Sequence, residues 1–331
     1  VMADGVLLAI DMGTTTARVL LFDTQGHPLA EAYREPPVYH PLPHCAEIDA
    51  EERWQCTAAL IREILAQSRI APSRVVAVGL SGLLHALTPI DEEGRVLARA
   101  MLWMDQRCQP QVEWMVREHR ATLERVMGWA GVSTTFSAPK LRWLAEHRAD
   151  VVGRARWFLA TKDFLRLRLT GTIATDPTDA GGTYLLDPHT RDWARPVVEM
   201  VGISMEQLPP IRRPEEVGGY VTAEAARLTG LPEGTRVVVG SGDTTCTRLG
   251  ANAEGGERGC LYLGTAAWVA APRARSGAFG ATATTGATLK WLASLLGQSA
   301  RDAPGASYAA LLRDADKAAP GAGGLIFLPH L

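Results

Sequence analysis

The sequence predicts an α/β fold in which strands and helices alternate along the chain. Residues 6–10 and 19–22 are short apolar runs of strand length, and residues 75–80 form a Val-rich run typical of a strand buried on both faces. Between these runs, the apolar residues from 54 to 65 recur at helical spacing. Strands that alternate with helices are typical of layered α/β domains, so we expect a sheet with helices packed on it.

The first two strands should form a hairpin. The residues between them include Gly13 and three threonines at positions 14–16, which indicate a Gly-Thr turn. A proline-rich loop over residues 36–43 follows. The next helix should begin just after Asp49, because this residue can cap a helix and the acidic residues that follow it suit a first turn.

The middle of the chain, residues 109–169, should be rich in helix, and residues 157–159 should supply part of an apolar helix face. The composition then changes. A loop rich in Asp, Thr and Gly is expected at residues 171–182, followed by turns at residues 209–210 and 218–219.

A second buried strand is expected at residues 236–240, and Asp243 comes soon after it. Because α/β proteins place chemistry at the carboxyl ends of parallel strands, Asp243 is well positioned. Farther along, residues 260–270 repeat the pattern of residues 10–22, two apolar runs joined by a Gly-Thr turn. This echo predicts a duplicated architecture. If the two turns face one another, they could hold a polyphosphate, although such turns are also common in hairpins that bind nothing.

The composition excludes several classes of protein. A chain of 331 residues suggests about two domains, and 34 Lys+Arg against 36 Asp+Glu leave a net charge of -2, so no nucleic-acid partner is expected. The five cysteines are scattered without a C-x-x-C motif, which argues against a disulfide framework or a zinc ribbon. No apolar run approaches the roughly 20 residues of a membrane span. We therefore expect a soluble cytoplasmic protein with no membrane partner.

Asp11 is the first candidate for chemistry, because it ends a predicted strand next to the Gly-Thr turn. A carboxylate there could hold hydrated Mg²⁺, and Gly13 would let the backbone approach a phosphate closely. The alternative is an Asp that only caps a turn. The chain has neither a Walker loop nor a G-x-G-x-x-G motif after a strand.

Asp243 is the stronger candidate for a general base. In a Gly-rich turn after an apolar strand, it could accept the proton of an attacking hydroxyl during phosphoryl transfer. An Asx turn without chemistry is the alternative. Residues 103–107 combine an aromatic ring with a carboxylate, an amide and a guanidinium, a mixture that can grip a polyol. His85 could reach the same pocket, although a histidine satisfied within the core is the more frequent outcome.

Three motifs, at residues 11–18, 102–107 and 240–244, resemble those of the FGGY carbohydrate kinases in order and interval. Within that family they look most similar to the motifs of xylulokinases. Further segments extend the resemblance over essentially the whole chain. These segments are residues 138–144, 162–171, 176–187 and 263–265.

The resemblance implies an actin/hexokinase-type fold, in which two ribonuclease-H-like domains hold ATP and sugar in the cleft between them. Residues 1–251 would form the N-terminal domain, and residues 252–331 would begin a C-terminal ATP-binding domain that is incomplete in this sequence. Residues 327–331 look like the opening of a family motif, after which the adenine-binding segment should follow. Relatives also carry additional sequence where this chain has residues 271–278.

The same resemblance implies roles for individual residues. Asp243 would be the catalytic base, and Asp11 would act near Mg²⁺, which it would hold through water. The implied sugar site consists of Leu84, His85, Trp103, Asp105 and Thr244. The residues implied to line the ATP phosphates are Gly13, Thr14, Thr15, Arg18, Gly264 and Thr265.

This chain departs from the xylulokinase pattern in the sugar motifs. Leu83 and Leu84 stand where xylulokinases usually have Gln and Met, and Met104 stands where they have Asn. Two polar side chains are thus replaced by apolar ones, which should change substrate discrimination. The Arg-Glu pair of glycerol kinases is absent at Leu84 and His85, so glycerol is disfavoured.

The leading hypothesis is an ATP- and Mg²⁺-dependent kinase that phosphorylates a terminal hydroxyl of a ketose such as xylulose, or of a related polyol. One alternative is a catalytically silent relative that binds sugar or nucleotide. Another is a kinase for a different sugar, such as another pentulose or a sugar acid, and an actin-like ATPase is a third. If the chain assembles, a homodimer is the expected form.

Overall fold

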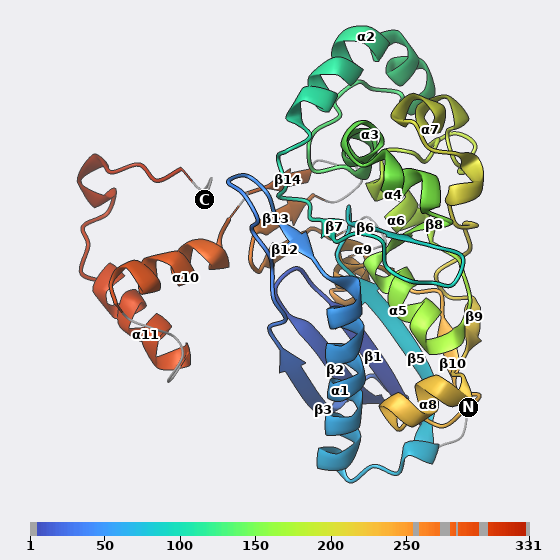
Figure 1. The fold of residues 1–331 in the computed structure, drawn as a ribbon. Coiled ribbons are helices and arrows are strands. Elements are labelled where there is room, and N and C mark those ends of the chain that lie inside the picture. Colours follow the sequence, from blue (N-terminus) through green and yellow to red (C-terminus); the bar gives the residue numbers. More distant parts are fainter. Residues whose placement is uncertain (1–4, 254–257, 272–278, 283, 298–303, 329–331) are drawn as a thin grey trace. The chain divides into compact units, whose positions relative to one another are not determined.

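The computed structural model describes residues 5–253, 258–271, 279–282, 284–297 and 304–328 (Figure 1). The chain divides into two compact units, Val1–Cys246 and Thr247–Leu331, which are treated separately below. Within the described ranges, no helix combines the length and the apolar character needed to cross a membrane.

Unit 1 is built on one mixed sheet. Its strand order is β3-β2-β1-β5-β10-β9, with the short β11 also paired to β5. β5 runs parallel to β1, β10 and β11, whereas the outer strands are antiparallel to their neighbours. The strands are β1 (Val6–Met12), β2 (Ala17–Asp23), β3 (Pro28–Arg34), β5 (Val75–Gly82), β9 (Val217–Tyr220), β10 (Arg236–Val238) and β11 (Ser241–Gly242).

The predicted hairpin, first helix and buried strand are confirmed. β1 and β2 pair through all seven residues of each strand, and β5 lies in the middle of the sheet. The helix α1 (Ala50–Ser68) begins after Asp49, whose side chain accepts hydrogen bonds from the backbone N–H groups of Glu51 and Glu52. Its apolar side packs on β2 and β3, and α5 (Thr161–Thr170) and α8 (Ala223–Thr229) pack beside it (Figure 1). Their buried side chains and those of the sheet form one apolar core.

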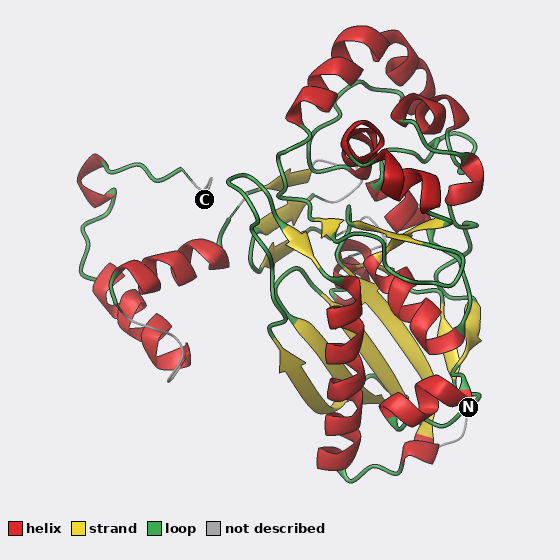
Figure 2. Cartoon of the chain, viewed as in Figure 1, coloured by secondary structure: helices red, strands yellow, loops and turns green. Residues whose placement is uncertain are grey.

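A second apolar core lies among helices grouped at one end of unit 1 (Figure 2). Small strand pairs connect this helical part to the sheet, with β4 against β7 and β6 against β8. The helices are α2 (Gln109–Met127), α3 (Ser137–His147), α4 (Ala149–Arg154) and α7 (Arg195–Val201). The strands are β4 (Glu47–Ile48), β6 (Leu87–Ile90), β7 (Ala100–Met101) and β8 (Trp157–Ala160), and single 3₁₀ turns are η1 (Pro72–Arg74) and η2 (Met205–Gln207).

Three local predictions are wrong. Residues 157–159 belong to β8 rather than to a helix, because their backbone pairs with the antiparallel strand β6. Residues 171–182 are not all loop, since Asp176 caps the short helix α6 (Pro177–Gly182) and Pro177 stands at its first position. Residues 218–219 lie within β9, where a Cβ on Gly218 would come within 2.7 Å of the Arg166 side chain on α5.

The predicted strand at residues 236–240 is interrupted before it reaches Asp243. β10 ends at Val238, and Gly240 adopts a φ of +81°, a left-handed conformation that glycine reaches at little cost. The chain then pairs with β5 again as β11. The break therefore moves the following residues onto the end of β5.

Unit 2 contains a small antiparallel sheet and two helices. The sheet order is β12 (Cys260–Leu263), β13 (Ala267–Ala270) and β14 (Phe279–Ala281), and the helices are α10 (Gly286–Leu295) and α11 (Pro304–Ala315), with the 3₁₀ turn η3 (Ala322–Gly324) after them. α9 (Asp243–Gly250) spans the boundary between the units. β12 and β13 form a hairpin with a Gly-Thr turn, so the echo of residues 10–22 is confirmed as local structure. Most of the segment at residues 271–278 lies outside the described residues.

Candidate functional site

The ends of three adjacent strands bring the two predicted catalytic carboxylates to one edge of the sheet. Asp11 of β1 lies beside Ser81 of β5, and Ser81 lies beside Ser241 of β11. The Ser81 hydroxyl donates a hydrogen bond of 2.8 Å to Asp11 Oδ1. Asp243 follows β11 directly, as the first residue of α9. Strand register thus joins residues that are 232 positions apart in the sequence.

Asp243 is half-buried, and its surroundings make it a stronger base than an ordinary carboxylate. Burial raises the pKa of Asp243 to about 6, and the negative charge of Asp11 contributes to the rise. Two hydrogen bonds from Thr244 to Asp243 Oδ1, 2.6 Å from the backbone nitrogen and 3.2 Å from the hydroxyl, act in the opposite direction. A carboxylate with this pKa is ionised at neutral pH and can still take up a proton, as a general base must.

Mg²⁺ fits this edge of the sheet. Two carboxylates interact here strongly enough for one to raise the pKa of the other, and oxygen donors of this kind suit a hydrated Mg²⁺ ion. Among the residues that the structure describes, no group of three or more His, Cys, Asp or Glu side chains could hold a metal directly. That Asp11 holds the ion through water stays a prediction.

The turn at residues 13–16, which is predicted to bind phosphate, is closed by a backbone hydrogen bond, and a buried arginine contacts its carbonyls. The Gly13 nitrogen donates to the Thr16 carbonyl at 2.9 Å. Arg53 of α1, only 1% exposed, donates to the carbonyls of Gly13 and Thr14 at 2.9 and 2.8 Å. Burial lowers the pKa of Arg53 to about 10, which leaves it charged beneath the turn at neutral pH. The sequence analysis did not identify Arg53. The only indication in the sequence is that this charged residue stands next to Trp54, which lies on the apolar face of α1.

Three further residues predicted to bind phosphate lie on or beside this turn. The Thr14 hydroxyl accepts a hydrogen bond of 3.0 Å from Trp103 Nε1, so the phosphate turn and the sugar motif are in contact. Thr15 lies in the same turn and is half-buried. Arg18 is the cross-strand partner of Asp11 in β2, but its exposed side chain pairs with Glu31 at 2.9 Å.

We expect Arg53→Met to loosen the turn and to destabilise unit 1. The change leaves the half-buried carbonyls of Gly13 and Thr14 without their charged donor, which should cost about 1–3 kcal/mol of unfolding free energy. Urea unfolding followed by tryptophan fluorescence would measure the loss. Arg62→Met, an exposed arginine on the same helix, is the matched control. Equal stability of the two variants would show that Arg53 does not support the turn.

His85 is held in one orientation at the end of β5. Its φ is +69°, a left-handed conformation that costs a non-glycine residue about 1 kcal/mol or more. Its Nδ1 lies 2.5 Å from the Gly182 carbonyl, and its ring meets Phe136 edge-on. Burial lowers the pKa of His85 to about 4, so the ring is neutral above that pH. Because a carbonyl only accepts, the proton sits on Nδ1 and Nε2 can accept a hydrogen bond from a ligand hydroxyl.

Lys140 of α3 supports the strained histidine from behind. Its buried Nζ donates to the backbone carbonyls of His85 at 3.0 Å and Thr135 at 2.9 Å. Burial lowers the pKa of Lys140 to about 7. The sequence placed Lys140 inside a family-like segment but gave it no role, because its partners are backbone carbonyls that no residue pattern reveals.

The other residues of the predicted sugar site differ in how free their side chains are to contact a ligand. Leu84 packs on the backbone of Gly182 and Gly242, where a Cβ at position 242 would collide with its side chain. Asp105 is fully buried and accepts hydrogen bonds from Arg107 and from the Ala46 nitrogen. Its carboxylate is thus engaged within the protein, and contact with a sugar stays a prediction. Trp103 is half-buried, and Thr244 is bonded to Asp243.

Leu83 and Met104, the two apolar residues that replace polar ones in the sugar motifs, both belong to or pack against a small apolar core. Leu83 is 1% exposed and belongs to an apolar cluster with Ile48 and Leu102, and Met104 packs against the same cluster. The loss of polar residues at these positions is therefore accommodated by packing.

In unit 2, the turn at Gly264 and Thr265 is braced by the start of α10. Gly264 donates to the Ala266 carbonyl at 2.9 Å, and its own carbonyl accepts from the Gly286 nitrogen at 2.9 Å. The Thr265 carbonyl accepts from the Thr285 nitrogen at 2.8 Å. The turn is hydrogen-bonded to the N-terminus of a helix, and a helix N-terminus can bind a phosphate. That this turn faces the one at Gly13 stays a prediction.

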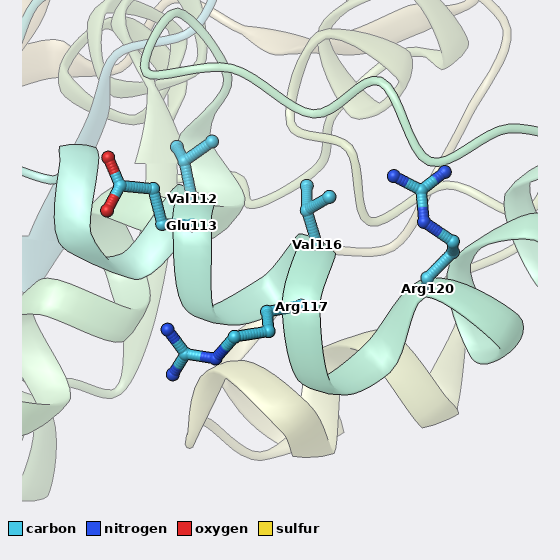
Figure 3. Close-up of a pocket in the computed structure, with 5 residues that line it drawn as sticks. All are labelled: Val112, Glu113, Val116, Arg117 and Arg120. Atoms are coloured by element: carbon cyan, nitrogen blue, oxygen red, sulfur yellow. The ribbon is translucent and has the colours of Figure 1, made fainter.

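A hollow elsewhere on unit 1 shares none of these residues. It runs along one side of α2 and is lined by Val112, Glu113, Val116, Arg117 and Arg120 (Figure 3). All five come from a single helix, so no groups from different elements converge on it, as they do at a ligand site.

Comparison with known proteins finds relatives that are kinases of small molecules. Xylulose kinase of Escherichia coli K12 is 33% identical over 258 residues, which cover 78% of this chain and 52% of the relative. Autoinducer-2 kinase of the same strain is 33% identical over 266 residues, covering 78% of this chain and 47% of the relative. This chain thus spans about half the length of these curated relatives.

Solved structures of sugar kinases are among those that match. The crystal structure of xylulose kinase from Rhodospirillum rubrum matches with a TM-score of 0.81 and 27% identity, over 98% of this chain and 69% of that one. That of gluconate kinase from Lactobacillus acidophilus, at 24% identity, matches with a TM-score of 0.82 over 99% and 68%. The actin/hexokinase-type fold is confirmed.

The model of the FGGY family of carbohydrate kinases, N-terminal domain, matches residues 6–250. This range contains both predicted catalytic carboxylates, the turn at Gly13 and every residue of the predicted sugar site. The chain therefore belongs to the FGGY family of carbohydrate kinases.

Proposed function

We propose that the protein transfers the γ-phosphate of ATP to a hydroxyl of a small sugar or polyol, with Asp243 as the general base. The observation that carries this proposal is the placement of Asp243 and Asp11 at the ends of adjacent strands at one edge of the sheet, where burial and the charge of Asp11 raise the pKa of Asp243. The Asp243 carboxylate would accept the hydroxyl proton as the oxygen attacks the phosphorus and ADP leaves. A silent binding protein would have no use for a carboxylate kept so basic, which is why we favour the kinase.

The remaining residues would bind and orient the reactants. Gly13, Thr14 and Thr15 would offer backbone and hydroxyl donors to the phosphates, with the charge of Arg53 beneath them. Mg²⁺, when bound near Asp11, supplies positive charge that neutralises the phosphate oxygens during transfer. We also propose that residues 1–251 carry the sugar site, and that residues 252–331 begin the ATP-binding domain to which Gly264 and Thr265 contribute. The reaction is proposed for the cytoplasm.

On the sugar side, Nε2 of His85 would accept a hydrogen bond from a hydroxyl, and Trp103 would cover a face of the ligand. Leu84 would set the shape of the pocket wall next to Asp243. This arrangement favours an uncharged, hydroxyl-rich acceptor. Xylulose is our first candidate because xylulose kinases are among the most similar relatives. Autoinducer-2 is the second, since autoinducer-2 kinases are equally identical to this chain.

The acceptor is identified by measuring ADP formation with a panel of xylulose, other pentuloses, glycerol, autoinducer-2 and sugar acids. We expect turnover with a ketose and none with glycerol. If no acceptor in the panel leads to ADP formation but a sugar binds in a calorimeter, the silent relative is favoured. Polymerisation on addition of ATP would instead favour the actin-like ATPase.

We expect His85→Phe to weaken sugar binding at least about tenfold, because phenylalanine fills the space but cannot accept the hydrogen bond. Wild-type affinity should be constant between pH 6 and 8, since a His85 with a pKa of about 4 stays neutral over that range. Isothermal titration calorimetry with the accepted sugar measures both. His147→Phe, an exposed histidine on α3, is the control. Affinity that falls as the pH drops from 8 to 6 in wild type but not in His85→Phe would contradict the neutral-histidine assignment.

A further inference from the structure

A buried group of charged side chains lies behind the catalytic edge of the sheet. Lys162 of α5 places its Nζ 2.7 Å from Asp163, 2.9 Å from Asp176 and 3.0 Å from Asp179. Each of these four residues is at most 3% exposed. Arg166 pairs with the same oxygen of Asp163, at 3.0 Å. The proposed reaction uses none of these residues.

Thr178 connects this charged group to the strand that carries Asp243. Its hydroxyl donates to Asp176 Oδ2 at 2.5 Å and accepts from the Gly242 nitrogen at 2.8 Å. The Ser241 hydroxyl lies 3.0 Å from the Thr178 hydroxyl oxygen. One hydroxyl on α6 therefore contacts both residues of β11.

β11 is a short strand, and Thr178 adds a hydrogen bond to its pairing with β5. The strand has only two residues, and it follows the left-handed Gly240 where the sheet is interrupted. Gly242 has no side chain, since Leu84 occupies the place where a Cβ would stand. Asp243 comes next, so a shift of the Gly242 amide moves the base relative to Asp11 and to the acceptor hydroxyl.

We propose that Thr178 is a positioning residue for Asp243: its hydroxyl ties the Gly242 amide to the buried Asp176–Lys162 pair and so fixes where the base stands. The role needs a group that donates and accepts at the same time, which a hydroxyl does and an alkyl group does not. The Thr178 hydroxyl donates its hydrogen bond to Asp176, so the lone pairs of its oxygen are directed toward the Gly242 amide. This inference rests on the proposed kinase function.

The test compares Thr178→Val with Thr178→Ser. Valine keeps the shape and also keeps the Thr178 backbone N–H that caps α6 through Asp176, so it removes only the hydroxyl. Serine restores the hydroxyl. Thr183→Val is the matched control, because the Thr183 hydroxyl bonds only within its own turn, to the Ala180 carbonyl and the Leu185 nitrogen, in the contacts described.

Two readouts are measured in the same protein. Amide hydrogen exchange by NMR follows Gly242 directly, and we expect Thr178→Val to exchange there at least about fivefold faster than wild type. Steady-state kinetics with ATP and the accepted sugar should show kcat about tenfold to a hundredfold lower and KM for sugar within about twofold. Thr178→Ser and Thr183→Val should resemble wild type in both. If Thr178→Val does not fold, Thr178→Ala is judged by the same criteria.

The proposal is overturned if wild type and Thr178→Val share the same exchange rate at Gly242, or if the valine variant raises KM with kcat unchanged, which would make Thr178 a sugar contact. It is also overturned if serine fails to restore kcat. These outcomes leave the kinase proposal intact. Absence of ADP formation by wild type with every acceptor would instead remove the kinase function, and with it the role of Thr178, whatever the exchange rates are.

Discussion

The Asp243→Asn substitution is expected to abolish phosphate transfer and, at neutral pH, to make the protein more stable. An amide cannot accept the hydroxyl proton, and loss of a general base costs a rate factor of about 10² to 10⁴. Sugar affinity should change little, because asparagine has almost the same shape as the aspartate it replaces. ADP formation and calorimetric sugar binding would separate the two effects.

The gain in stability follows from the direction of the pKa change. The pKa of Asp243 is about 6 in the folded protein, above the value of 3.8 for a free side chain. The folded state therefore binds the proton more tightly, and stability falls as the pH rises from about 4 through 6. Above pH 6 the ionised carboxylate lowers the unfolding free energy of wild type by up to about 3 kcal/mol, and the asparagine variant has no such loss. Its melting temperature should exceed that of wild type at pH 7.5, and the difference should vanish near pH 4.

The control for this experiment is Asp316→Asn, which removes the same charge from an exposed position in unit 2. It should leave both turnover and melting temperature unchanged. Wild-type turnover should also fall below pH 6 as Asp243 takes up its proton. An asparagine variant that turns over normally would exclude Asp243 as the base. A variant that melts below wild type at pH 7.5 would show that the carboxylate contributes to the fold.

The parts of the molecule that could be predicted from the sequence are those governed by local patterns. The hairpin around Gly13, the helix after Asp49 and the buried β5 each have a periodicity or a cap that acts within a few residues. Asp11 and Asp243 could also be found, because strand ends are recognisable in a sequence and parallel strands bring their ends together.

The parts that could not be predicted depend on contacts between distant segments. The apolar run at residues 157–159 is compatible with a helix or a strand until β6 is present to pair with it. α6 has the composition of a loop, and only the capping geometry at Asp176 makes it a helix. Arg53 and Thr178 act on backbone atoms of residues far along the chain. Such partners carry no residue identity, so no pattern in the sequence indicates them.

Removal of the buried cation at Lys162 should be the most destabilising single change in unit 1. Burial raises the pKa of Asp179 well above its usual range, so its ionised form is disfavoured in this site. Two cations, Lys162 and Arg166, lie among the buried acids of this group. Lys162→Met leaves these acids with one cation in a fully buried site, which typically costs about 3–5 kcal/mol.

Asp179→Asn is the matched variant, because it keeps the shape of the side chain and removes an acid whose ionised form is disfavoured by burial. It should therefore be far better tolerated than Lys162→Met in urea unfolding at pH 7.5. Lys317→Met, which breaks an exposed pair with Asp314, controls for the general loss of a lysine. If Asp179→Asn proves as destabilising as Lys162→Met, the Asp179 carboxylate is itself required as a partner of Lys162, whose Nζ lies 3.0 Å away. We expect the milder result, because burial already disfavours the ionised form of Asp179 and an amide oxygen can still accept a hydrogen bond from Lys162.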